Sequence, residues 1–155
     1  MKIVFCSNYF NHHQQPLSDC LYGFLGDQYH FIETSEISAA RKKLGWGIEQ
    51  YPPYVVTKNM VEESSSTVKA MINEADVVIL GEAPLSMIEE RCKSKKLILR
   101  YSERILKNGF EPLKYPIRWL RYHKQNPRYA NIRVLCASAY TATDYAKFGM
   151  FKNKC

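Results

Sequence analysis

Residues 76–84 read DVVILGEAP, and the predicted fold depends on this stretch because Val77 to Leu80 are apolar at four consecutive positions. A strand that is apolar on both sides is typical of a parallel sheet whose two faces are covered by helices. The run LIL at 97–99 has the same character. The sequence therefore predicts a sheet of buried parallel strands.

Short apolar runs alternate with amphipathic stretches along the rest of the chain. The predicted strands are residues 2–6, 29–33, 54–57, 76–80, 97–101 and 132–136. The predicted helices are residues 15–25, 38–44, 65–74, 85–94, 116–126 and 141–148. This alternation predicts an α/β, Rossmann-like, doubly wound and mainly parallel sheet of about six strands in the order 3-2-1-4-5-6, with helices on both faces. The less regular link at 34–53 is either a lid or a surface excursion.

Size and composition predict one domain over residues 1–155, in which 46% hydrophobic residues are enough to bury a core. The apolar runs are far shorter than a bilayer-spanning helix needs, and the first strand pattern begins at Lys2. Five cysteines without paired short spacings favour neither a zinc site nor a disulfide framework. We therefore expect a cytoplasmic protein with no metal and no cofactor.

The charge is unevenly distributed along the chain. Residues 91–133 hold 13 Lys and Arg against 2 Asp and Glu, whereas the rest of the chain holds 9 against 13. A basic region of this kind is typical of a polyanionic partner, which can be a nucleic acid, an anionic lipid or a phosphate-bearing ligand. A merely solvated basic face would have the same composition.

The predicted helix at 116–126 lies within this basic region. Its cations and aromatic residues suit the headgroup layer of an anionic membrane, and the same cations would suit RNA. No recognition motif for nucleic acid is present, so we expect no nucleic-acid partner. The predicted membrane-binding residues are Lys114, Arg118, Trp119, Arg121 and Tyr122. In the alternative interpretation, Ile117 and Leu120 pack inward and the arginines stay in water.

Ligands of doubly wound sheets bind beyond the carboxyl ends of the strands. The loop after the first strand, SNYFNHHQQP at 7–16, contains no glycine, which argues against a dinucleotide site, and no P-loop or GxSxG motif occurs. Adjacent side chains diverge, so His12 and His13 are poor ligands for one metal ion. A histidine here can instead act in acid/base chemistry or, like Asn8 and Asn11, hydrogen-bond sugar hydroxyls. Alternatively, one histidine packs against the fold and the other is solvated.

Two later loops also follow predicted strands. In YSER at 101–104, Glu103 would orient a polar substrate and Arg104 would meet a phosphate, although both side chains can equally face solvent. In ASAY at 137–140, small residues around Ser138 allow either the close approach of a ligand or the tight packing of a helix on the sheet.

Four stretches together carry a resemblance to a known family. They are SNYFNHHQQPLSDCLY, DVVILGEAP, LRYSER and LCASAYTATDYAKFGMFKNK. Over nearly the whole chain, the sequence resembles the N-terminal half of bacterial glycosyltransferases with the GT-B fold. These are the retaining enzymes of family 4, which act in the assembly of capsules, exopolysaccharides and other cell-surface glycans. The resemblance implies a first domain that binds the acceptor and a second domain, beyond residue 155, that binds a nucleotide-sugar donor.

The resemblance also implies roles for single residues. The loop that holds Asn11, His12 and His13 would face the cleft, where one histidine would contact the donor sugar or the acceptor, with His13 as the catalytic candidate. The acceptor side would be lined by Glu82, Ser102, Glu103, Arg104 and Ser138. The acceptor would be a glycan or a lipid-linked glycan, which would place the protein at the inner face of the membrane.

Two departures from the family pattern qualify these expectations. The glycine-rich turn of many relatives is absent after the first strand, and no E-x(7)-E motif of the donor domain is recognisable. We therefore expect this chain alone to be inactive in transfer. The rival hypotheses are a non-enzymatic α/β module that docks an anionic membrane or nucleic acid, and a small self-contained nucleotide-sugar or sugar-phosphate enzyme.

Overall fold

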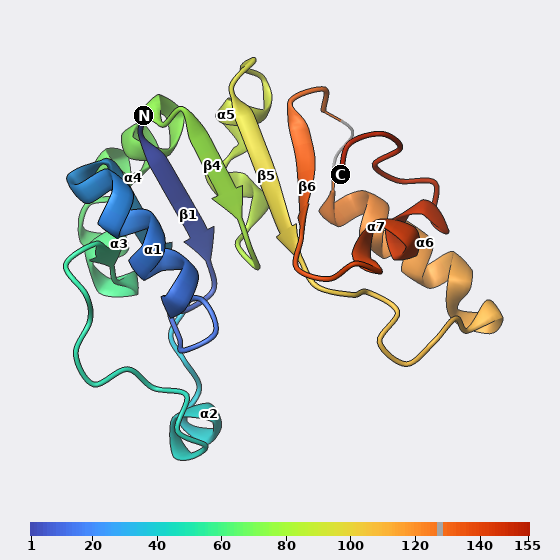
Figure 1. Ribbon diagram of the computed structural model, residues 1–155, viewed down its shortest axis with the longest axis horizontal. Helices are drawn as coiled ribbons and strands as arrows, with labels where there is room; N and C mark the ends of the chain where they lie inside the picture. Colours follow the sequence, from blue (N-terminus) through green and yellow to red (C-terminus); the bar gives the residue numbers. More distant parts are fainter. Residues whose placement is uncertain (127–128) are drawn as a thin grey trace.

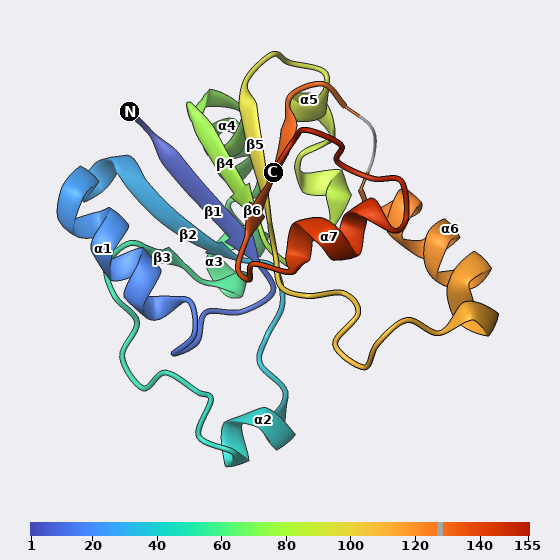
Figure 2. The same ribbon diagram turned by 45° about the vertical axis from the view of Figure 1, so that its right-hand side comes forward.

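The computed structural model describes residues 1–126 and 129–155, and it contains a six-stranded sheet in the order β3-β2-β1-β4-β5-β6 (Figures 1 and 2). All strand pairs are parallel. The strands are β1 (Ile3–Ser7), β2 (Tyr29–Glu33), β3 (Val55–Val56), β4 (Val77–Leu80), β5 (Leu97–Ser102) and β6 (Ile132–Cys136). The predicted α/β class, the strand order and the parallel pairing are therefore confirmed.

The helices agree with the predictions where the apolar periodicity is strong. They are α1 (Gln15–Leu25), α2 (Ala39–Lys43), α3 (Lys58–Glu63), α4 (Ser65–Glu74), α5 (Glu89–Cys92), α6 (Tyr115–Gln125) and α7 (Thr141–Ala146), with single 3-10 turns at Gly26–Gln28, Leu85–Met87 and Pro112–Lys114. The prediction of one helix over 85–94 is wrong, because the buried Ile88 adopts φ −115° and ψ 11° and separates the turn from α5. Helix α3 was not predicted.

Apolar layers cover both faces of the sheet. On one face, α1 packs Leu17 and Leu21 against a layer that includes Phe5 and Phe31, and on the other, α4 contributes Val68 and Ile72 (Figure 1). All five residues of β1 are buried, as expected for a central strand. Helices α6 and α7 lie beside β6, at one edge of the sheet (Figure 2).

A buried arginine joins α4 to the two strands that follow it. The Arg91 side chain is 1% exposed, and its guanidinium donates to the carbonyl oxygens of Ile72, Ala75, Asp76 and Leu97 at 2.6–2.9 Å. The last carbonyl groups of a helix lack partners within the helix, and Arg91 supplies donors for them. Burial lowers the pKa of Arg91. This residue counts toward the basic region of the sequence but contributes nothing to a basic surface.

The ends of β1 and β4 meet at the point where the strand order reverses. A Cβ atom at Gly81 would lie 2.6 Å from Ser7 Oγ, so only glycine permits this approach. The loops after β1 and β4 therefore start side by side, which is the position where doubly wound sheets bind ligands.

Candidate functional site

An open hollow of about 530 Å³ lies at the carboxyl edge of the sheet, and we call it the carboxyl-edge hollow. It is lined by His13, Tyr101, Glu103, Arg104, Lys107, Ala137 and Ser138, which come from β5 and from the loops after β1, β5 and β6. The structure thus brings four of the predicted site residues together, namely His13, Glu103, Arg104 and Ser138. The other four, Asn11, His12, Glu82 and Ser102, are not among the residues that line it.

The loop after β1 is held by side chains that accept hydrogen bonds from its backbone. Asn11 is buried, and its Oδ1 accepts from the His13 amide at 2.8 Å. Glu33, at the end of β2, accepts from the Phe10 amide at 2.7 Å. Burial raises the pKa of the Glu33 carboxyl, and the hydrogen bond from the Phe10 amide offsets part of this rise. Asn11 therefore holds the loop in shape, and the side chain of His13 extends from a backbone that the hydrogen bond to Asn11 fixes.

Two further residues of the predicted set also hold loops in place. Glu82 accepts a hydrogen bond from Asn8 Nδ2 at 3.2 Å, which connects the loops after β1 and β4. The Ser102 hydroxyl lies 2.9 Å from the hydroxyl of Tyr145 on α7. Neither residue is among those that line the carboxyl-edge hollow.

Part of the 34–53 link folds against the two histidines. The expectation that the adjacent side chains of His12 and His13 diverge is wrong, because their ring centroids are 4.0 Å apart. Trp46 meets the two rings edge-on at 5.6 and 5.3 Å. The Arg41 guanidinium lies 5.3 Å from the ring of Tyr9 and 5.2 Å from that of Trp46. Helix α2 itself projects beyond the carboxyl ends of the strands (Figures 1 and 2). Sequence reasoning did not identify Trp46, because it follows no predicted strand.

Arg104 has a fixed orientation in the hollow. It forms a two-point ion pair with Asp144 of α7, with Nε to Oδ2 at 3.1 Å and Nη2 to Oδ1 at 3.3 Å. Burial by itself raises the pKa of Asp144, but hydrogen bonds from Arg104 and from the Leu106 amide outweigh it and hold the pKa below its usual value. Hydrogen bonding to Asp144 raises the pKa of Arg104. Sequence reasoning missed Asp144, and its position inside a predicted helix gave no signal.

The wall of the hollow combines an aromatic ring with polar groups. Tyr101 packs edge-on against Phe5, with ring centroids 5.7 Å apart. Glu103 pairs with Lys107 on the rim, four residues later in the chain. The site therefore offers one apolar surface, hydrogen-bond donors and hydrogen-bond acceptors within the same open space.

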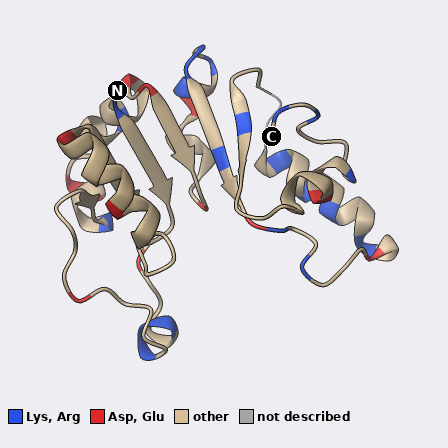
Figure 3. Ribbon diagram, in the orientation of Figure 1, with Lys and Arg blue, Asp and Glu red and all other residues tan. Residues whose placement is uncertain are grey.

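The basic region carries a different kind of surface. In α6 no residue is buried, and the side chains of Leu113, Ile117 and Leu120 are 96%, 72% and 64% exposed. The alternative in which Ile117 and Leu120 pack inward is therefore wrong. Lys and Arg are frequent in this half of the molecule (Figure 3). Of the predicted membrane-binding residues, Lys114 and Arg118 both pair with Glu111.

The two aromatic residues of that predicted set have partners within the structure. Trp119 stacks on His123, with ring centroids 4.0 Å apart. Tyr122 packs edge-on against Phe148 and donates from its hydroxyl to the Ile105 carbonyl at 3.3 Å. Tyr122 therefore helps to attach α6 to the domain.

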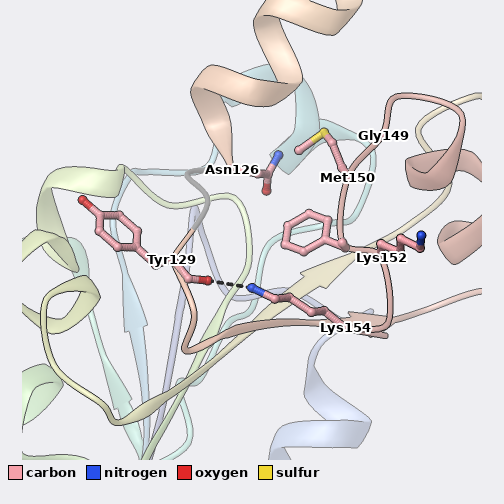
Figure 4. A pocket seen from close by; sticks show the side chains of 7 residues that line it. Asn126, Tyr129, Gly149, Met150, Lys152 and Lys154 are labelled. Atoms are coloured by element: carbon pink, nitrogen blue, oxygen red, sulfur yellow. Dashed lines mark hydrogen bonds between the residues drawn. The ribbon is translucent and has the colours of Figure 1, made fainter.

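A smaller hollow of about 210 Å³ lies near the start of β6 (Figure 4). Lys154 Nζ donates there to the Tyr129 carbonyl at 3.0 Å, while Met150 forms part of the wall. It contains none of the predicted site residues.

Within residues 1–126 and 129–155, no group of three potential metal ligands comes together. In the same part of the chain, no helix has the length and apolar character to span a membrane.

Comparison with protein-family models, with curated proteins and with solved structures finds no match for this chain.

Proposed function

We propose that the carboxyl-edge hollow is one wall of a sugar-binding crevice, and that the chain is the acceptor-binding part of a glycosyltransferase. The enzyme would transfer a sugar from a nucleotide-sugar to a glycan or lipid-linked acceptor of the cell surface. The observation that supports this most directly is the convergence of His13, Glu103, Arg104 and Ser138 on one solvent-open space. They come from three separate loops at the edge where such sheets bind ligands.

The chemistry of the lining matches that of a sugar. Each sugar hydroxyl both donates and accepts a hydrogen bond, and the lining contains an acceptor in Glu103, a donor in Arg104 and two bidirectional groups in His13 and Ser138. The ring of Tyr101 provides an apolar surface for the C–H face of a pyranose. In the proposed reaction, His13 contacts the reacting sugar, and the donor diphosphate is held by a second wall. Positioning and electrostatics then lower the barrier.

Binding of sugars to this chain tests the proposal. Methyl glycosides of common hexoses, added at millimolar concentration to the ¹⁵N-labelled protein, should shift backbone amides of residues 101–107 and 137–138. His13→Ala should weaken this binding, whereas His123→Ala, a histidine substitution on α6, should not. Amide shifts that cluster elsewhere, or that are the same in His13→Ala, would contradict the proposal.

A second surface favours peripheral attachment to an anionic membrane. Leu113, Ile117 and Leu120 lie at spacings of four and three, so they share one side of a helical segment that is exposed to solvent. Exposed cations of α6 include Arg121 and Lys124. An exposed apolar stripe flanked by cations suits the interface of an anionic bilayer, where the apolar side chains enter the acyl boundary. This surface also fits the rival hypothesis of a binding module.

Vesicle flotation tests the membrane proposal. The protein should float with phosphatidylglycerol-containing vesicles and much less with pure phosphatidylcholine vesicles. The double variant Ile117→Ser/Leu120→Ser should lose flotation, and Arg121→Glu should weaken it. Leu44→Ser, which removes an equally exposed leucine from the region of α2, is the matched control. Equal flotation of all variants would refute the proposal.

A further inference from the structure

Both long cationic side chains that line the carboxyl-edge hollow already have a carboxylate partner. Arg104 donates to both oxygens of Asp144, and Lys107 pairs with Glu103. The four formal charges cancel, so this rim has no net charge although it lies in the basic region of the sequence. The charge of the region as a whole is therefore a poor guide to the ligand of this site.

The pair of Arg104 and Asp144 is fixed from both sides. The Asp144 side chain is 2% exposed, and its Oδ2 also accepts from the Leu106 amide at 3.2 Å. The guanidinium carbon of Arg104 lies 4.9 Å from the centroid of the Tyr140 ring, which supports the guanidinium from another direction. Since the pKa of Asp144 is held below its usual value, this carboxylate stays ionised at neutral pH and keeps Arg104 compensated.

We infer that the carboxyl-edge hollow binds the uncharged, hydroxyl-bearing part of its substrate, and that Asp144 determines this preference by compensating the charge of Arg104. The inference rests on the proposed sugar-binding function. A phosphate that takes Arg104 for itself leaves a buried carboxylate without its cation, which is costly. A hydroxyl requires no such exchange, because a guanidinium that spends two N–H groups on Asp144 still has three for other acceptors.

Glu103 has the corresponding role at the rim. Its carboxylate accepts hydrogen bonds from hydroxyl groups and repels a phosphate, while it also compensates Lys107. Asp144 and Glu103 thus act as specificity-determining residues, one from beneath the site and one from its surface. A phosphorylated or diphosphate portion of the substrate would lie outside this hollow.

The test compares uncharged with phosphorylated sugars on the same ¹⁵N-labelled protein. The probes are the methyl glycosides of glucose, galactose and mannose and the 1-phosphates of the same hexoses. Dissociation constants come from the amide shifts of residues 101–107 and 137–138. Asp144→Asn removes the buried charge but keeps an acceptor for the Leu106 amide, and Glu103→Gln removes the exposed charge. Arg104→Gln in the Asp144→Asn background is the control.

We expect the wild-type protein to bind a methyl glycoside more tightly than the corresponding phosphate. Asp144→Asn and Glu103→Gln should each strengthen binding of the phosphates about tenfold, since one charge-assisted hydrogen bond is then free for them. Their affinity for methyl glycosides should stay within about threefold, a change of under 1 kcal/mol. The control should lose the gain seen in Asp144→Asn.

Four results would overturn the inference. If the wild-type protein prefers the phosphates, the preference for uncharged ligands is wrong while the sugar-binding function stands. If neither class of sugar shifts these amides, the sugar-binding function itself fails. If Asp144→Asn folds but gains no affinity for the phosphates, Asp144 does not determine the preference. If that variant does not fold, Glu103→Gln decides alone, because its side chain is exposed and its substitution leaves the interior unchanged. No gain for phosphates in Glu103→Gln would then refute the inference.

Discussion

Replacing Arg91 by methionine removes a guanidinium that serves four main-chain carbonyl groups at 2.6–2.9 Å. These oxygens lie at the end of α4, immediately before β4 and at the start of β5. Methionine is unbranched and flexible, so it fills much of the same space and the variant loses hydrogen bonds more than packing. The perturbation therefore isolates the contribution of the buried charge.

The expected loss of stability follows from two opposing effects. Four hydrogen bonds from a charged donor, at about 1.5 kcal/mol each, contribute about 6 kcal/mol to the folded state. Removing the buried cation also removes its desolvation cost, which offsets about 3 kcal/mol of this. We therefore expect Arg91→Met to lower the free energy of unfolding by about 3 kcal/mol, a large part of the stability of a small domain.

Urea unfolding followed by circular dichroism measures this loss. The midpoint should fall while the slope with urea stays constant, because the surface exposed on unfolding is unchanged. Arg91→Lys, whose ammonium has three donors, should recover about half of the loss. Arg121→Met, at an exposed arginine of α6, should stay within about 0.5 kcal/mol of the wild type. A loss below about 1 kcal/mol in Arg91→Met would refute the reasoning about its hydrogen bonds.

Three further predictions concern the edge of the sheet that holds the candidate site. Gly81→Ala places a Cβ atom 2.6 Å from Ser7 Oγ, so it should cost about 1–3 kcal/mol in urea unfolding, and Ser7→Ala should recover part of it; an unchanged midpoint would contradict this. The depressed pKa of Asp144 means that its contribution to stability is present above about pH 4 and is lost as pH falls through its folded-state pKa. Between about pH 5 and about pH 2, the wild type should therefore lose more stability than Asp144→Asn, and parallel curves would exclude this role. Trp46→Ala should loosen the segment around α2 and so speed trypsin cleavage at its already exposed basic residues, whereas Trp119→Ala should not; equal cleavage rates would show that Trp46 does not anchor this segment.

Much of the fold follows from local patterns. The bounds predicted for β2, β6, α1 and α4 are those of the structure, because each segment has a clear apolar period and a turn signal at its end. Helix α3 was missed because Met60 and Val61 are its only apolar residues, too few to show a helical period. The prediction for 85–94 failed at Ile88, which is buried in a non-helical conformation that its periodicity does not reveal.

The candidate site was predictable where a residue follows a strand. His13, Glu103, Arg104 and Ser138 were found because the carboxyl ends of parallel strands share one edge. Asp144 and Trp46 lie in other elements and reach the site or its neighbouring loop only through tertiary contacts. The sequence also left undetermined whether Ile117 and Leu120 face the domain or the solvent, because an amphipathic pattern does not specify which face of the helix meets the domain. The structure shows that both side chains face solvent.

By itself, the sequence determined which segments become buried parallel strands and in what order they pair, because apolar period and the handedness of crossovers are local and general constraints. Only the tertiary structure decided which charges are free. Arg91 and Arg121 belong to the same basic stretch, yet one is enclosed by carbonyl groups and the other faces solvent. Charge compensation depends on distance in space and on burial, and the partners of Arg91 and Arg104 lie 6 to 40 residues away along the chain.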